Sequence, residues 1–451
     1  MELNNIAFIN YTASGGGAGR ICSLLHQAFN GSFLYNKFEQ DLDKGIVRID
    51  NFRFRNQFHK TIKYLLDLSL SKRWPYIPRV FSFILNYFSE PLRRINIQFG
   101  KEDFCFPGTS CRSKFLIKEP TLVHLHNLFP DYFDLRSLKV LSKKYPLLIT
   151  AHDCWLMTGH CAHPIDCQRF KIGCGHCPDL TIPPSIVRDN TRQNLNTKIR
   201  IYSSSKMYLA TPCNWLKEKF IESKVGTFFE EIRVIPNGIR TDHFFPITNK
   251  EELHKKYDLS KNALIFCFVG NRVTDNPWKN FQLMLDSLKI FAQNHPRKVI
   301  FLCVGEEKEP ISFPNLDCRF IKSTNEIKEL NEIYNCADYY FHMAKADTFP
   351  NTILEAQACG LPVFANPICG ISEQVIEGKT GWFLRDSFPD DIASRISGYL
   401  EDSNYPEMQR NCRSHIENNF SVEKMISSYS AFYSDILKSR SFSSPNSLVS
   451  Q

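Results

Sequence analysis

The sequence predicts an α/β protein with two lobes, each built around a parallel sheet. The chain has 451 residues, which is enough for two domains of roughly 200 residues each. Short apolar runs alternate with segments of helical length, as in a series of βα units. This series stops near Pro236 to Pro246 and then starts again, so we predict a first lobe over 1–235 and a second over 236–421.

The first lobe is predicted to begin with a strand, a glycine-containing turn and a helix. Its apolar runs predict strands at 6–11, 121–128, 145–153, 207–213 and 231–239, with the turn at 12–19 and the helix at 21–29. The runs are nearly continuous in apolar residues, as expected of parallel strands that are covered on both faces. Polar residues that follow them therefore belong to the crevice at the carboxyl ends of the strands.

The second lobe repeats this pattern. Apolar runs predict strands at 263–271, 299–305, 317–322, 338–344 and 361–366, each followed by a segment of helical length. A further helical stretch covers 422–438, and the Ser-rich end at 439–451 is predicted to be disordered.

Composition narrows the class of protein. No stretch of about 18 apolar residues is free of charge, so a membrane-spanning helix is not expected. The N-terminus lacks a basic region ahead of an apolar run, which predicts a first strand and a cytoplasmic protein. Most of the 16 cysteines stand alone in the sequence, which favours reduced core thiols over a disulfide framework.

The net charge of +8 is concentrated in one segment. Between Asn51 and Lys101, ten basic residues are interleaved with aromatic and aliphatic ones and accompanied only by Asp67 and Glu90. Such a segment can lie on an anionic membrane surface. A pair of amphipathic helices with a basic solvated face is the equally weighted alternative, and nucleic-acid binding is not expected because no recognition motif accompanies the charge.

The segment DTFPNTILEAQACGLPV at 347–363 predicts a ligand site. It places Asp347 in a loop, Pro350 at the start of a helix and Glu355 one turn further along. The first amides of a helix lack intrahelical acceptors and the helix dipole adds positive potential there, so a diphosphate can dock near Asn351. Asp347 and Glu355 would then reach the hydroxyls of a nucleotide-sugar.

The same segment resembles the donor-site signature of the retaining glycosyltransferases of family 4, also called group 1. In that signature an acid, seven residues and a Glu precede Gly-x-Pro-Val, here Gly360 to Val363. The first acid is usually Glu, and Asp347 is shorter by one methylene. The resemblance implies a GT-B fold, with two Rossmann-like lobes facing a central cleft and the helix at 422–438 crossing back to the first lobe. Residues 235–246 resemble the interdomain segment.

Two cations follow the first strand of the second lobe. Arg272 and Lys279, in GNRVTDNPWKN, can stabilise the negative charge that develops on a nucleoside diphosphate leaving group. Solvated surface charges are the alternative. The positions resemble the family's Arg and Lys pair, although the usual Gly after the Lys is Asn280. Because no Asp-x-Asp constellation stands at a likely donor site, we expect these cations to replace a catalytic metal, so that catalysis requires no cofactor.

The first lobe supplies the remaining candidates. Glycine turns alone are weak evidence, but the resemblance implies that Gly16 and Gly17 lie over the donor diphosphate. A dinucleotide site is not expected, because the acid it requires is missing and Asp50 is too distant. The resemblance also implies that His152 lines the reaction centre, where it positions or polarises a sugar hydroxyl and is not a general base.

Residues at the ends of two neighbouring strands are candidates for the acceptor side, namely His126, Asn127 and Asp153. His124 and His126 share a strand face and therefore also suggest a metal, but no third ligand stands at a suitable spacing.

The loop at 154–178 is rich in cysteine, glycine and proline. Cys161, Cys167, Cys174 and Cys177 end in a C-x-x-C pair, so four thiolates could hold a structural zinc ion. Cys154, His160, His163 or His176 could replace one ligand, and two disulfides or plain buried thiols remain open. This block, and GKEDFCFPGT at 100–109, resemble exopolysaccharide glycosyltransferases of the colanic-acid type.

The sequence therefore predicts a retaining glycosyltransferase for bacterial exopolysaccharide synthesis. Its donor would be a UDP- or GDP-sugar, and the resemblance implies a lipid-diphosphate-linked oligosaccharide acceptor and a peripheral location at the inner membrane. Two alternatives remain, a nucleotide-sugar 2-epimerase of the same architecture and a non-catalytic scaffold held by zinc.

Overall fold

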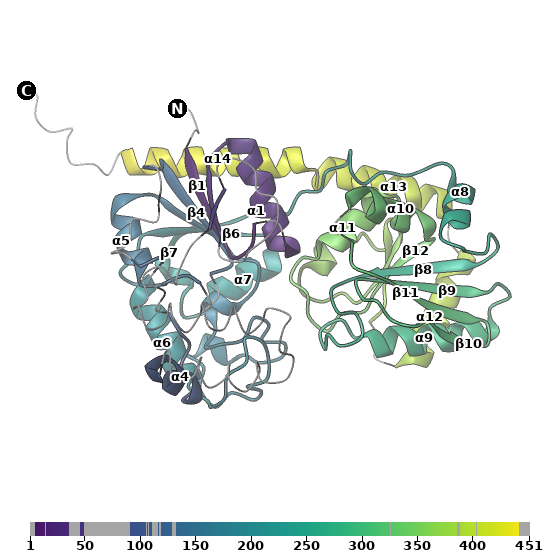
Figure 1. The fold of residues 1–451 in the computed structure, drawn as a ribbon, viewed down its shortest axis with the longest axis horizontal. Helices are drawn as coiled ribbons and strands as arrows, with labels where there is room; N and C mark the ends of the chain where they lie inside the picture. The colour runs from purple at the N-terminus through teal and green to yellow at the C-terminus, as the bar shows by residue number, and fades with distance from the viewer. Residues whose placement is uncertain are drawn as a thin grey trace, which may run out of the picture. The chain divides into compact units, whose positions relative to one another are not determined.

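The computed structural model describes most of the chain as two compact units (Figure 1). The described residues are 5–13, 15–35, 46–48, 91–104, 106, 108–110, 116, 119–128, 132–324, 326–385, 388–402 and 404–441. Unit 1 consists of Met1–Thr211, Leu216–Val234 and Tyr429–Gln451, and unit 2 of Pro212–Trp215 and Ile235–Ser428. The basic segment predicted to bind a membrane lies mostly outside the described residues, and so does the end of the tail.

Unit 1 is built on a seven-stranded parallel sheet in the order β3-β2-β1-β4-β5-β6-β7. Its strands are β1 Ile6–Asn10, β2 Ser32–Tyr35, β3 Ile46–Arg48, β4 Leu122–His126, β5 Leu147–Thr150, β6 Met207–Thr211 and β7 Phe229–Val234. Every residue of β1, β4 and β5 is buried, as expected of parallel strands that are covered on both faces.

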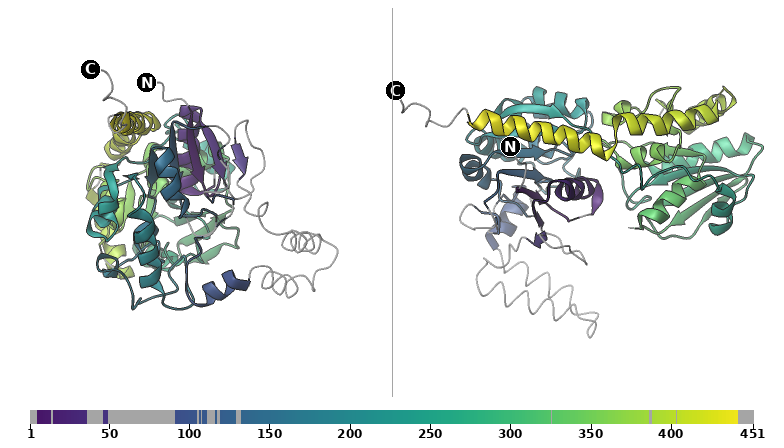
Figure 2. Two further views of the ribbon diagram at one scale, coloured as in Figure 1. Left: turned by 90° about the vertical axis from the view of Figure 1, so that its left-hand side faces the viewer. Right: turned by 90° about the horizontal axis from the view of Figure 1, so that it is seen from above.

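The helices of this part of the chain are α1 Gly16–Phe29, α4 Pro91–Gln98, α5 Ser137–Lys144, α6 Thr191–Tyr202 and α7 Asn214–Glu222, with short 3-10 helices η1 Trp155–Met157, η2 Arg169–Lys171 and η3 Gly226–Phe228. Figure 2 shows α14, Val422–Ser441, as one long helix. From Tyr429 onward α14 belongs to unit 1. It extends through the first three residues of the tail for which disorder was predicted.

Unit 2 contains the second seven-stranded sheet, in the order β10-β11-β9-β8-β12-β13-β14. Its strands are β8 Leu264–Val269, β9 Val299–Val304, β10 Ile311–Phe313, β11 Leu316–Ile321, β12 Tyr339–His342, β13 Val363–Ala365 and β14 Gly381–Phe383. Only the pairing of β10 with β11 is antiparallel among the described strands of this sheet. It forms a hairpin at the sheet edge that the sequence patterns did not reveal.

Helices cover both faces of this second sheet (Figure 1). They are α8 Lys250–Lys256, α9 Phe281–Asn294, α10 Ile327–Cys336, α11 Asn351–Ala358, α12 Pro389–Asp402 and α13 Tyr405–Asn419, with the 3-10 helix η4 Cys369–Glu373. Helix α8 illustrates the local rules: the Asn249 side chain accepts a hydrogen bond from the Glu252 amide, acids occupy its first turn and bases its last.

The fold prediction is confirmed, since both units are parallel α/β lobes. In each sheet the chain first runs outward and then returns to the other side of its first strand, so the strand order reverses between β1 and β4 and between β8 and β12. Ligands of open parallel sheets bind in the crevice outside the carboxyl ends of the strands at such a reversal. The predicted site residues follow these four strands or the neighbouring β5.

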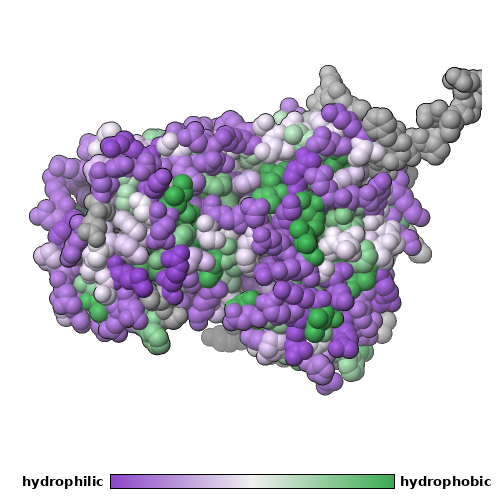
Figure 3. All heavy atoms as spheres, turned by 180° about the vertical axis from the view of Figure 1, so that it is seen from behind, coloured by the Kyte–Doolittle hydropathy of each residue, from purple (hydrophilic) through white to green (hydrophobic). Residues whose placement is uncertain are grey.

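No described helix is both long enough and apolar enough to cross a bilayer. On the face drawn in Figure 3, hydrophilic side chains prevail and the hydrophobic ones form small separate groups.

Candidate functional site

The strand reversal in unit 2 brings together Lys279 and Asp347. Lys279 Nζ lies 2.6 Å from Asp347 Oδ2, and each side chain is 19% exposed. The ion pair is thus reachable from solvent but partly shielded from it. The sequence predicted both residues as site residues. They stand 68 positions apart in the chain, and their direct contact shows that the fold brings them to one place.

His342 completes this group, and sequence reasoning missed it. It is the last residue of β12, fully buried, and its Nε2 lies 3.8 Å from Asp347 Oδ2. Burial, followed by the positive charge of Lys279, lowers the pKa of His342 to about 3, so the ring is neutral. Neither ring nitrogen has a hydrogen-bond partner within the described part of the chain. Its position at the end of a strand beside the reversal is the signal that could have revealed it.

Backbone packing fixes the loop that holds Lys279. Gly305 follows β9 with φ +120°, and a Cβ there would stand 1.7 Å from the carbonyl oxygen of Gly270. Only glycine permits this approach. The ends of β8 and β9 therefore lie close together, and the segment 270–280 starts from a fixed point.

Arg272 and Glu355 are not drawn into this group. The Arg272 guanidinium is 73% exposed and lies 3.9 Å from the carboxylate of Asp275. Glu355 is 1% exposed, and its Oε2 accepts a hydrogen bond of 2.9 Å from the Tyr334 hydroxyl. Their predicted roles in donor binding stay predictions.

Helix α11 begins at Asn351, directly after Pro350, as the sequence predicts. Asn351 Oδ1 accepts a hydrogen bond of 2.8 Å from the Asn237 side chain, and Gln374 donates to the Pro350 carbonyl at 3.0 Å. The helix contains no acid in its first turn. Its N-terminus is therefore held firmly and keeps the positive potential that suits an anion.

The glycines after β1 occupy the corresponding place in unit 1. Gly16 starts α1 with φ +73°, and a Cβ there would meet nothing within 4 Å. Conformation, and not crowding, thus favours glycine at this position. Gly16 and Gly17 are both exposed, and contact with a diphosphate stays a prediction.

The polar residues after β4 and β5 gather around one pocket of about 220 Å³. Asn127, His152 and Asp153 line it together with Trp155 and other residues. Asn127 has φ +43°, a left-handed conformation that Asn tolerates. The sequence predicted these three polar residues as site residues, and the structure places them on one pocket wall.

Burial sets the protonation of this pocket. It lowers the pKa of His152 to about 4, so the ring is neutral near pH 7. It raises the pKa of Asp153 to about 6, opposed by a hydrogen bond from the Trp155 amide. His126 does not line the pocket, but its Nδ1 lies 3.0 Å from His152 Nε2.

A buried ion pair supports the pocket, and sequence reasoning missed it. Lys198 Nζ lies 3.0 Å from Glu102 Oε2, and both side chains are at most 2% exposed. The ammonium also donates to the carbonyls of Trp155 and Thr158, at 2.8 and 3.0 Å. Burial lowers the pKa of Lys198 and raises that of Glu102, while their mutual attraction opposes both shifts. The loop after His152 is therefore tied to α6.

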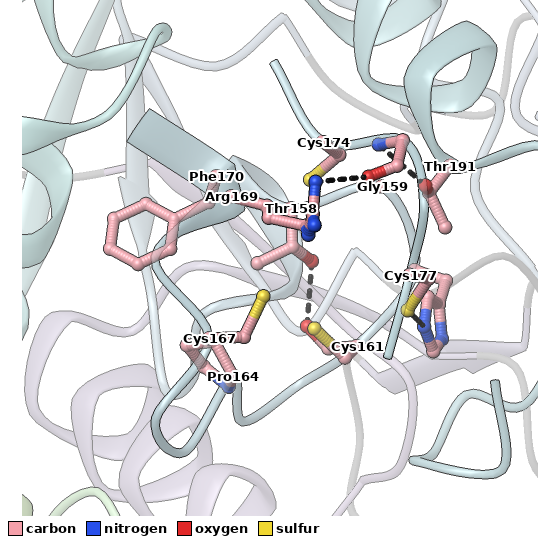
Figure 4. A pocket seen from close by; sticks show the side chains of 12 residues that line it. Thr158, Gly159, Cys161, Pro164, Cys167, Arg169, Phe170, Cys174, Cys177 and Thr191 are labelled. Carbon is pink, nitrogen blue, oxygen red and sulfur yellow. Dashed lines mark hydrogen bonds between the residues drawn. The ribbon is translucent and has the colours of Figure 1, made fainter. Parts of the chain in front are cut away.

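Figure 4 shows the four predicted zinc ligands around a second pocket, of about 290 Å³. Cys161, Cys167, Cys174 and Cys177 are all free thiols. His160 Nε2 lies 3.2 Å from Cys177 Sγ. Burial raises the pKa of Cys161 to about 12 and that of Cys174 to about 11, so both thiols are protonated.

A structural zinc ion is held by four side chains, usually Cys or His, in a tetrahedral arrangement. No three His, Cys, Asp or Glu side chains in the described part of the chain are placed so that they could hold a metal ion. The thiols thus share a pocket without forming a tetrahedral site. The zinc ligands stay a prediction from their spacing, and so does the alternative of plain thiols.

Residues 249–418 match the sequence model of the family described as Glycosyl transferases group 1. We call this stretch the group 1 domain, after the family that it matches. The predicted resemblance to that family is confirmed. The domain includes Arg272, Lys279, Asp347 and Glu355, together with His342, whereas the histidines of unit 1 and the thiol pocket lie outside it.

Two curated relatives of the chain are Escherichia coli proteins named as sugar transferases. The chain is 29% identical over 268 residues to the putative colanic acid biosynthesis glycosyl transferase WcaC of Escherichia coli, covering 54% of this chain and 60% of WcaC. It is 27% identical over 219 residues to an Escherichia coli UDP-Gal:alpha-D-GlcNAc-diphosphoundecaprenol alpha-1,3-galactosyltransferase, covering 46% and 55%. The matches thus span little more than half of the relatives' length.

Solved structures similar to the whole chain share its fold. A sucrose-phosphate synthase from Thermosynechococcus elongatus aligns with a TM-score of 0.62 at 15% identity, over 97% of this chain and all of that one. HepE of Anabaena, in complex with UDP-glucose, aligns with a TM-score of 0.58 at 14% identity, over 96% and 99%. The group 1 domain therefore belongs to a protein of GT-B architecture.

Proposed function

We propose that the protein transfers a sugar from a nucleotide-sugar donor to a growing surface polysaccharide, with retention of the anomeric configuration. The observation that favours this most is the Lys279–Asp347 pair beside His342 at the strand reversal of the group 1 domain. Lys279 can bind a diphosphate while Asp347, released from the ion pair, accepts hydrogen bonds from sugar hydroxyls.

The donor proposal also rests on two cations of the group 1 domain, Lys279 in the ion pair and Arg272 outside it. Lys279, assisted by the exposed Arg272, supplies positive charge where the leaving diphosphate becomes more negative. Such charge stabilises the transition state more than the bound donor. Catalysis in this proposal needs no divalent metal. It also needs no protein nucleophile, so the neutral His152 does not have to act as one.

The acceptor that we propose is a lipid-diphosphate-linked oligosaccharide, which the protein would meet as a peripheral protein on the cytoplasmic face of the inner membrane. One relative is named for a diphosphoundecaprenol-linked substrate. The basic and aromatic residues between Asn51 and Lys101 have the composition that binds anionic lipid surfaces.

A transfer assay tests the function. Purified protein is incubated with UDP- or GDP-sugars and short-chain polyprenyl-diphosphate-linked sugars, and the product linkage is read by NMR. An α-linked product from an α-linked donor supports the proposal. A β-linkage contradicts retention, and an epimerised nucleotide-sugar formed without acceptor indicates the 2-epimerase.

A further inference from the structure

Three histidines of unit 1 form a row at the ends of β4 and β5, in which His124 and His126 are buried and His152 is half-buried. His124 and His126 stand two positions apart on β4 and so share a face. His126 pairs in register with Thr150, the last residue of β5, and His152 follows two positions later. The His126 and His152 rings are stacked, with centroids 5.3 Å apart and planes at 25°.

The contact between His126 and His152 requires one donor and one acceptor. His126 Nδ1 and His152 Nε2 are 3.0 Å apart. Burial lowers the pKa of both rings, so each is neutral and carries a single N–H. A neutral imidazole donates from one nitrogen and accepts at the other. Two tautomer pairs are therefore compatible with the distance alone.

The far nitrogen of His126 separates these two pairs. His126 Nε2 is buried and has no hydrogen-bond partner among the described residues. If the proton of His126 were on Nε2, a buried N–H would be left unsatisfied, which is rarer and more costly than an unused lone pair. The proton therefore belongs on Nδ1, and His126 donates to His152.

Neighbouring groups prevent the His126 ring from turning over. The His124 ring lies against it with centroids 4.2 Å apart. His124 is itself fixed, because its Nδ1 lies 2.8 Å from the Tyr433 hydroxyl and its Nε2 lies 2.7 Å from the Thr150 hydroxyl. The Thr150 hydroxyl is also 2.9 Å from that of Tyr429. Two tyrosines of α14 thus hold the row in place.

We infer that His126 is a positioning residue that donates from Nδ1 to His152 Nε2 and thereby holds the proton of His152 on Nδ1. His152 then offers an N–H donor to a ligand in the pocket that it lines with Asn127 and Asp153. An N–H donor polarises a sugar oxygen but cannot remove a proton. The inference rests on the proposed function and assigns His152 the role of hydrogen-bond donor in it.

NMR of protein labelled with ¹⁵N-histidine tests the inference directly. Long-range ¹H–¹⁵N correlations, assigned to His152 through a His152→Asn variant, report which ring nitrogen carries the proton. We expect an unprotonated Nε2 and a protonated Nδ1. A His152 protonated on Nε2 would overturn the inference, whatever the enzymatic activity.

Two substitutions of His126 provide the functional readout. Asn places an amide N–H near the position of Nδ1, so His126→Asn should preserve the His152 tautomer and most of kcat. His126→Leu removes the donor, so the Nε2-protonated form should appear and kcat should fall about tenfold or more, the effect of losing an orienting partner. An unchanged tautomer and kcat in His126→Leu would contradict the inference.

The outcomes separate the inference from the function on which it rests. If His126→Leu does not fold, as judged by circular dichroism, the wild-type tautomer and the Asn variant still decide. A Nδ1-protonated His152 in a protein that transfers no sugar would refute the proposed function and leave the positioning of His152 intact.

Discussion

At the scale of single residues, the proposed donor site depends on the charge of Lys279. Its ammonium is paired with Asp347 at 2.6 Å, and both side chains are reachable from solvent. Asp347 is one methylene shorter than the Glu that is usual at this position of the family signature. In the structure, this shorter side chain forms the direct ion pair with Lys279. In the proposed function, a diphosphate would compete for the same ammonium.

Replacing Lys279 with Ala should weaken the binding of UDP or GDP by about 2 kcal/mol, roughly thirtyfold, because a charge-assisted hydrogen bond is lost. Isothermal titration calorimetry measures this change. Lys261→Ala is the matched control, since Lys261 forms an exposed ion pair with Glu251 and should leave the dissociation constant unaltered. Equal affinities for Lys279→Ala and wild type would remove Lys279 from the site.

Asp153 should make stability depend on pH. Its pKa is about 6 in the folded protein and 3.8 ordinarily, so ionisation disfavours the fold. This contribution to stability is present below pH 3.8 and is lost as the pH rises through 6. Because Asp153 is only partly buried, the loss is on the order of 2 kcal/mol.

Asp153→Asn should therefore become more stable relative to wild type between pH 4.5 and pH 7.5. Urea unfolding at both values measures the difference, in which the opposite effect of the neutral histidines cancels. A stability difference independent of pH would show that Asp153 titrates normally.

At the scale of elements, the buried pair of Glu102 and Lys198 joins α6 to the loop that carries Asp153 and η1. Lys198→Met leaves the Glu102 carboxylate buried without its partner, so unfolding should become easier by about 3–5 kcal/mol. Lys261→Met, at an exposed pair, should cost less than about 1 kcal/mol. Thermal and urea unfolding of both variants measure this, and similar small losses would contradict a supporting role.

The loop at 154–178 has a prediction of its own. The spacing of its four cysteines predicts about one equivalent of zinc in protein purified without chelator, measured by atomic emission. Cys174→Ser should lower the zinc content if the thiols are ligands. Less than half an equivalent in the wild type would leave the protonated thiols as the state of this pocket.

Local patterns predicted the elements well, because each depends on neighbouring residues. The run 263–271 contains β8, and Pro350 marks the start of α11. Pairings over long sequence distances were not predictable in this way. Glu102 contacts Lys198, and Glu355 contacts Tyr334, only once the sheets have formed. His342 was missed because a histidine within an apolar run is taken for a core residue until the strand order is known.

At the scale of the whole molecule, the two units repeat one arrangement. Each sheet reverses its strand order once, and the predicted site residues follow the strands at the reversal or, for His152 and Asp153, the neighbouring β5. Helix α14 contains residues of both units and supplies the tyrosines that fix the histidine row in unit 1. The central claim is that the group 1 domain binds a nucleotide-sugar through fixed charges.

The most direct test titrates the purified protein with UDP-, GDP- and ADP-sugars by calorimetry, with and without EDTA. The account predicts that one donor binds well above the others and that EDTA leaves its affinity unchanged. Binding that disappears with EDTA would contradict the metal-independent site. Failure of every donor to bind would contradict the transferase and favour a non-catalytic scaffold.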